Sequence, residues 1–278
     1  MPIHDQSYRR YEGHRGKTGR AWMVIARAGI RASLDRKTLL ALLLLAWLPC
    51  VVRVMQIYAA VSVPQAAFLA PDAGTFHQFL VQQDVFVFFV TVYVGAGLIA
   101  NDRRANALQI YLSKPLTRFE YVLGKLAVVV TFLLVITWLP AVVLLITQTV
   151  LSGNLTFIEG NLSLLPAITL FSIVQALMAG LSVLALSALS RNSRSVGIMY
   201  AALLFFSQAV VGVLKSATGN TWWSLISMAS DLTQFGDAVF QKPFDGPPWP
   251  ASCLMILVLF AVSGLILDRR VRGVEVVA

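Results

Sequence analysis

The stretch L-A-V-V-V-T-F-L-L-V-I-T-W-L-P-A-V-V-L-L-I-T-Q-T-V-L-S-G-N-L-T-F-I, residues 126–158, contains no charged side chain. A helix needs roughly 20 apolar residues to cross a bilayer core about 30 Å thick, and this stretch exceeds that length. Similar runs recur five times, two of them interrupted or bounded by one charge. The sequence therefore predicts an all-α, polytopic membrane protein with six transmembrane helices. The expected spans are about 38–61, 84–100, 120–151, 163–189, 195–214 and 250–268.

The distribution of basic residues predicts the orientation of these spans. Nineteen of the 22 Lys and Arg side chains fall on one side of the six-span arrangement, and the other side holds Lys215 and Lys242. Cytoplasmic loops of membrane proteins carry this excess of positive charge. We expect a multi-pass protein of a bacterial cytoplasmic (inner) membrane with both termini in the cytoplasm. The net charge of +9 then reflects topology rather than a nucleic-acid partner.

The region before the first span divides into a polar tail and an amphipathic segment. At 100° per residue, Arg20, Arg27 and Arg31 share one helix face, and Trp22 and Ile25 lie on the other. This pattern is typical of a helix in the membrane interface, although a plain extension of the first span is the alternative. The expected organisation is a mobile cytoplasmic tail (1–18), an interfacial helix (19–37), a transmembrane domain (38–268) and a cytoplasmic tail (269–278).

A long segment, 215–250, separates the fifth and sixth spans on the outer side. It holds Trp222 and Trp223 and is too apolar for a solvated loop, while Asp231 and Asp237 make it too charged for a span. We expect a re-entrant or interfacial helical segment here.

Two charged side chains fall at membrane depth. Arg53 lies about 22 Å from the start of the first span, at 1.5 Å per residue, and Asp84 begins the second. A charge at this depth needs a partner or a route to water. We hypothesise an ion pair between Arg53 and Asp84; the alternative is that each reaches the outer interface separately.

The charged connection between the second and third spans, residues 101–125, predicts two helices with a break. Asp102 is placed to cap a short helix, and Pro115 ends it. Thr117 and Glu120 form a capping-box pattern at the start of the third span, with Leu116 and Tyr121 placed as a hydrophobic staple. A stiff connection of this kind can transmit force.

Arg103 and Arg104 would then stand in the first turn of the short helix, where the helix dipole disfavours cations. Two interpretations remain open. The arginines either follow the distribution of positive charge next to the second span, or they contact an acidic surface of a partner.

The run R-x-x-A-L-Q-x-Y-L-S-K-P-L-T-R-x-E-Y-V-L-G-K, residues 104–125, resembles the membrane subunits of type-2 ABC exporters. It is similar to the group that includes the nitrous-oxide-reductase maturation permease. The resemblance implies six spans, an interfacial N-terminal helix, re-entrant outer helices, and a coupling helix that docks in a groove of the ATPase. By that resemblance the partner-binding residues are Arg103, Arg104, Leu108, Leu112 and Glu120, with Glu120 and Lys125 anchoring the third span.

The resemblance implies a permease subunit, expected to act as an exporter and to form a homodimer. Its partners would be a second permease copy, the lipid bilayer and two copies of a cytoplasmic ABC ATPase, which would bind ATP and Mg. The uncharged interior of the spans is also compatible with a mechanical role on a periplasmic partner. A membrane anchor or sensor that recruits a soluble partner without transport is the alternative, and a membrane-embedded enzyme is a weaker one.

The residues themselves predict no catalytic or metal site and no cofactor in this chain. The segment G-H-R-G-K-T, residues 13–18, ends like a phosphate-binding loop, but Tyr11 stands where its first glycine is required. The histidines are scattered, and Cys50 and Cys253 fall in apolar segments.

Overall fold

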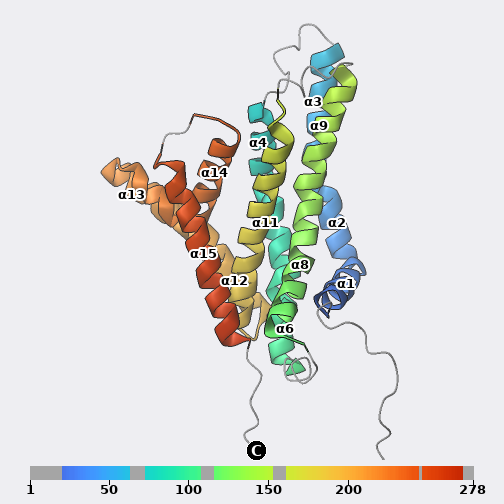
Figure 1. Ribbon diagram of the computed structural model, residues 1–278, viewed down its shortest axis with the longest axis vertical. Helices are drawn as coiled ribbons and strands as arrows, with labels where there is room; N and C mark the ends of the chain where they lie inside the picture. The colour runs from blue at the N-terminus through green and yellow to red at the C-terminus, as the bar shows by residue number, and fades with distance from the viewer. Residues whose placement is uncertain (1–20, 63–72, 108–115, 153–160, 244–245, 272–278) are drawn as a thin grey trace, which may run out of the picture.

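A computed structural model describes residues 21–62, 73–107, 116–152, 161–243 and 246–271, all helices and connections with no strand among them (Figure 1). The tail predicted for residues 1–18 lies outside these ranges. In chain order the elements are α1 (Ala21–Leu34), α2 (Lys37–Ala46), α3 (Leu48–Ser62), α4 (Ala73–Gln82), α5 (Asp84–Val90), η2 (Thr91–Gly95), α6 (Ala96–Arg104), α8 (Arg118–Ile136), α9 (Trp138–Ser152), α11 (Leu164–Leu189), α12 (Ser193–Ala201), η3 (Ala202–Phe206), α13 (Ser207–Thr218), η4 (Thr221–Ile226), α14 (Met228–Val239) and α15 (Trp249–Arg270).

Six helical stretches of the described chain are long and apolar enough to cross a membrane, which confirms the predicted class and number. Five of them begin and end within four residues of the expected bounds. The second begins earlier than predicted, because Phe76, Phe79 and Leu80 are buried in the core and extend the helix before Asp84. The stretches are Lys37–Ser62, Gly74–Arg104, Arg118–Leu151, Leu164–Leu189, Ser193–Thr218 and Trp249–Arg270.

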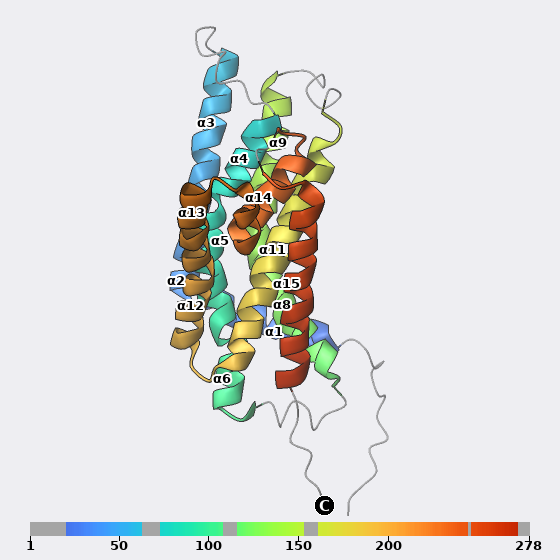
Figure 2. The same cartoon turned by 90° about the vertical axis from the view of Figure 1, so that its left-hand side faces the viewer.

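Helix α11 runs through the middle of the bundle and is the most buried of the six (Figures 1 and 2). Its buried face is rich in small residues, including Ala176, Gly180 and Ser187, which allow neighbouring helices to approach closely. Helices α8, α6 and α15 pack around it. The fifth span, α12 to α13, is the least buried and leans away from α11 toward its far end (Figure 1).

Two of the spans bend where the sequence places a proline. Pro49 follows the break between α2 and α3 at Trp47, and Pro140 follows the break between α8 and α9 at Thr137. Proline has no N–H to donate and its ring clashes with the carbonyl four residues earlier, so the helix kinks just before it.

Helix α1 lies across α8 near the lower end of the bundle in Figure 1. Two glycines make this crossing close: a Cβ added at Gly29 would lie 2.6 Å from Val128, and one at Gly124 would lie 2.8 Å from Ile25. The predicted amphipathic segment is therefore a helix that is packed against the third span.

The segment between the fifth and sixth spans contains two short helices, η4 and α14, at the end of the bundle opposite to the α6–α8 connection (Figure 2). Gln208 on α13 accepts hydrogen bonds from Ser227 and Ser230, and Ser252 on α15 donates to Gln234 at 2.6 Å. These contacts hold α14 between α13 and α15.

Candidate functional site

The two sides of the connection between α6 and α8 are joined by a half-buried polar contact. Asp102 Oδ2 lies 2.7 Å from Lys125 Nζ and accepts a hydrogen bond of 2.7 Å from the Tyr121 hydroxyl. Both charged side chains are largely shielded from solvent, with 12% of Lys125 and 19% of Asp102 exposed. The end of the second span is thus tied to the start of the third, about one turn (Tyr121) and two turns (Lys125) inside α8.

Asp102 does not cap a new helix, and this expectation is corrected. The residues Asp102, Arg103 and Arg104 form the last turn of α6, which is continuous with the second span. Asn106 follows with a φ of 52°, a left-handed conformation that asparagine adopts more readily than most residues and that ends helices. The helix dipole therefore favours the two arginines at this position, and their charge requires no further explanation.

The two arginines differ in their surroundings. Arg103 Nη1 donates a hydrogen bond to the carbonyl oxygen of Ala188, at the end of α11, whereas Arg104 is exposed. The positive charges of Arg191 and Arg270 also act on Arg103. Arg103 therefore holds α6 to α11, and Arg104 is free to face outward. The tertiary structure gathers basic side chains from three distant parts of the chain at this end.

Ser187 provides a second link between α6 and α11. Its hydroxyl donates to the carbonyl of Ala96 at 2.8 Å and accepts from the backbone N–H of Ala100 at 2.9 Å and of Ile99 at 3.2 Å. These backbone groups lie directly after η2, a π-helical turn, where the α-helical hydrogen bonds between N–H groups and carbonyls four residues earlier are interrupted. The end of the second span is therefore bonded to both α8 and α11.

The capping box at the start of α8 is confirmed. Thr117 Oγ1 accepts from the Glu120 N–H at 3.2 Å, and Glu120 Oε2 accepts from the Thr117 N–H at 3.1 Å. No salt bridge to Glu120 occurs among the described residues. Phe119, which the sequence reasoning did not single out, is 72% exposed between them. Leu108 and Leu112 lie outside the described residues.

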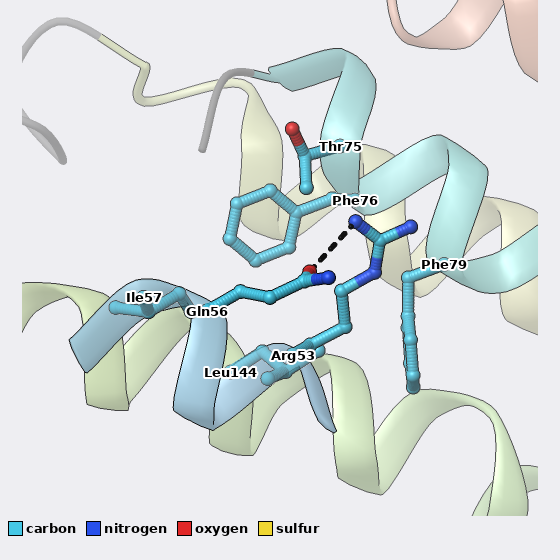
Figure 3. Close-up of a pocket in the computed structure, with 7 residues that line it drawn as sticks. All are labelled: Arg53, Gln56, Ile57, Thr75, Phe76, Phe79 and Leu144. Atoms are coloured by element: carbon cyan, nitrogen blue, oxygen red, sulfur yellow. Dashed lines mark hydrogen bonds between the residues drawn. The ribbon is translucent and has the colours of Figure 1, made fainter. Parts of the chain in front are cut away.

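Arg53 and Asp84 are not brought together. The Arg53 side chain extends toward α4 between Phe76 and Phe79, and its guanidinium donates to Gln56 at 3.2 Å (Figure 3). The surrounding pocket holds only about 20 Å³, room for about one water molecule. In the described part of the chain, the salt bridges join Asp102 to Lys125 and His77 to Asp237.

Asp84 lies instead within the second span, opposite the central helix. Its Oδ1 accepts a hydrogen bond of 2.6 Å from the side-chain amide of Gln175 on α11. The other polar atom of that amide, Gln175 Oε1, is buried without a hydrogen-bond partner among the described residues. The contact therefore leaves the amide oxygen of Gln175 without a donor.

A cavity of about 560 Å³ lies beside Asp84 and Gln175, where the fifth span leans away from α11. The volume lies within the range of small-molecule sites, about 300–1,000 Å³. The hydropathy of a single span does not indicate this cavity, because the second, fourth and fifth spans and α14 all contribute to its walls. Its lining is mainly apolar and aromatic: Asp84, Val85, Val87, Phe88, Phe89, Gln175, Ala179, Tyr200, Leu204, Phe205, Gln208, Met228, Ala229 and Leu232.

Within the described ranges, no group of three or more His, Cys, Asp or Glu side chains is arranged to hold a metal ion. No protein-family model matches this chain, and no curated protein matches it.

Proposed function

We propose that this chain is the permease subunit of an ATP-binding-cassette exporter, located in a bacterial inner membrane. It would work as a homodimer with two copies of a cytoplasmic ATPase, which would bind ATP and Mg. The observation that carries the proposal is the bonded junction of the second and third spans: Asp102, Lys125 and Tyr121 close a connection whose sequence resembles a coupling segment.

A rigid junction is what force transmission requires. The end of α6 is bonded to α8 through Asp102 and to α11 through Arg103 and Ser187. A displacement of the 105–117 connection by a partner would therefore move three spans together. Two packed arrangements of these spans, each favoured by one nucleotide state of the ATPase, would constitute the transport cycle.

The surface of the junction end suits an acidic partner with an apolar groove. Arg104 is exposed, its neighbour Arg103 lies near the basic side chains of Arg191 and Arg270, and Phe119 presents an exposed aromatic ring. Aromatic residues and arginine are the residue types most often found as energetic anchors of interfaces. The same side chains fit the expected cytoplasmic location of this end.

The test is co-purification of an ATPase from the membranes in which the chain is native. We expect the tagged chain to retain an ABC ATPase and its ATP hydrolysis. Arg104→Glu combined with Phe119→Ser should lose the bound ATPase and its ATP hydrolysis, because it removes the proposed contacts with the partner. Both side chains are exposed, so the variant should still fold. Lys215→Glu, which changes a charge at the opposite end of the bundle, is the matched control and should retain them.

Retention of the ATPase by the double variant would contradict the assignment of this surface. An anchor or sensor would also retain a soluble partner, so a second measurement is needed. In proteoliposomes containing the complex, a transported molecule should change the rate of ATP hydrolysis; a complex without transport would hydrolyse ATP at one rate whatever is added.

A further inference from the structure

The cavity beside the fifth span combines one acidic side chain with a cluster of aromatic rings. Asp84 and Phe88 are four residues apart on one helix, so they project on the same face. The ring of Phe88 lies 5.3 Å from that of Phe205 and 6.0 Å from that of Tyr200, measured between centroids. The rings come from the second and fifth spans and face the same space.

Asp84 has no basic partner in this cavity. Its one hydrogen bond comes from the uncharged amide of Gln175, and none of the described residues that line the cavity is Lys, Arg or His. An ionisable side chain within a membrane span is costly unless it is paired. Gln175 Oε1 is a buried acceptor with no donor among the described residues. The cavity thus holds one carboxylate without a basic partner, and its other polar side chains, Gln175, Gln208 and Tyr200, are uncharged.

Both spans that supply the aromatic rings contain a π-helical turn next to the cavity. Thr91–Gly95 follows the helix of Asp84 and Phe88, and Ala202–Phe206 carries Leu204 and Phe205 into the lining. Such turns add a residue to the helix and occur frequently at functional sites because they redirect side chains. This observation is independent of the charge of the cavity and points to the same location.

We propose that this cavity is a binding site for an organic cation with an apolar body. The cationic group would lie against Asp84, and the apolar body among the rings of Phe88, Phe205 and Tyr200. Aromatic faces attract cations within about 6 Å of the ring centroid. Gln208 and Ala229 line both this cavity and a polar pocket at the α14 end. That such a cation is the cargo rests on the proposed permease function; its binding does not.

The test is equilibrium binding of tetraphenylphosphonium, a permanent organic cation, to the purified full-length chain in detergent without any ATPase. We expect saturable binding that triphenylmethanol, a neutral molecule of similar bulk, does not displace. Asp84→Asn keeps an acceptor for Gln175 but removes the charge, and should weaken binding at least about tenfold, or about 1.4 kcal/mol. Asp268→Asn, an exposed carboxylate at the other end of the bundle, should bind like the native chain.

Ala229→Phe provides a second variant that fills the cavity from α14 and leaves Asp84 unchanged. It should also lose binding, and it decides the outcome if Asp84→Asn fails to fold. Absence of saturable binding to the native chain, native-like binding by a folded Asp84→Asn, or retained binding by Ala229→Phe would each overturn the proposal. Because no ATPase is present, these outcomes do not depend on whether the chain docks one.

Discussion

Substitution of Gly124 by alanine should separate α1 from the third span. A Cβ at this position would lie 2.8 Å from Ile25 Cβ and 2.9 Å from the carbonyl oxygen of Trp22. Neither neighbour can rotate away, because one is the branch point of a β-branched side chain and the other is backbone. The added methyl group must therefore push the two helices apart.

The magnitude follows from a comparison with Gly264 on α15, where a Cβ would meet no atom within 4 Å. Alanine is favoured over glycine within a helix by roughly 0.5–1 kcal/mol, and both substitutions share this gain. Forcing a methyl group into a packed contact costs about 1–3 kcal/mol. We therefore expect Gly124→Ala to be less stable than Gly264→Ala by about 1–3 kcal/mol in free energy of unfolding, since the shared gain cancels.

The assay is reversible unfolding of both variants and the native chain in mixed micelles with increasing SDS, followed by circular dichroism. Amide exchange should also increase within residues 21–34 of Gly124→Ala and remain native in Gly264→Ala. Equal stability of the two variants, with native protection of that helix, would refute the close crossing of α1 and α8.

Three other substitutions test the junction and the α14 segment. Asp102→Asn keeps the hydrogen bond from Tyr121 but removes the charge facing Lys125, and should lower the free energy of unfolding by about 1.5–3 kcal/mol, while Asp268→Asn should change it little in the same SDS titration. Ser187→Ala leaves the backbone groups of Ala96 and Ala100 without their partner; we expect a loss of about 1–3 kcal/mol by that titration, and faster exchange of the Ala100 amide. Burial raises the pKa of Asp231 from 3.8 to about 7, so the folded chain keeps a proton that the unfolded chain has lost, and stability should fall as the pH rises through this window. In Asp231→Asn this position carries no charge at any pH, and the melting temperature should therefore decrease less than that of the native chain between about pH 5 and about pH 8. Parallel curves of melting temperature against pH would contradict the raised pKa of Asp231.

The sequence by itself determined the class of the protein and most of its spans. Hydropathy is a local quantity, and an uncharged apolar run as long as 126–152 argues for a membrane helix whatever surrounds it. The capping box of Thr117 and Glu120 was equally predictable, because its atoms lie within four residues of one another.

The tertiary structure decided which polar groups meet. Arg53 and Asp84 carry opposite charges and have similar predicted depths in the membrane. Asp84 nevertheless contacts Gln175, which is 91 residues away in the sequence. Asp102 contacts α8 instead of beginning a helix, so Arg103 and Arg104 stand in a last turn, where the helix dipole favours them, and not in a first turn. Partner choice depends on how helices are rotated and packed against each other, and the periodicity of one helix carries no information on its neighbours. The aromatic cavity beside the fifth span likewise depends on tertiary packing, since its lining comes from three spans and α14.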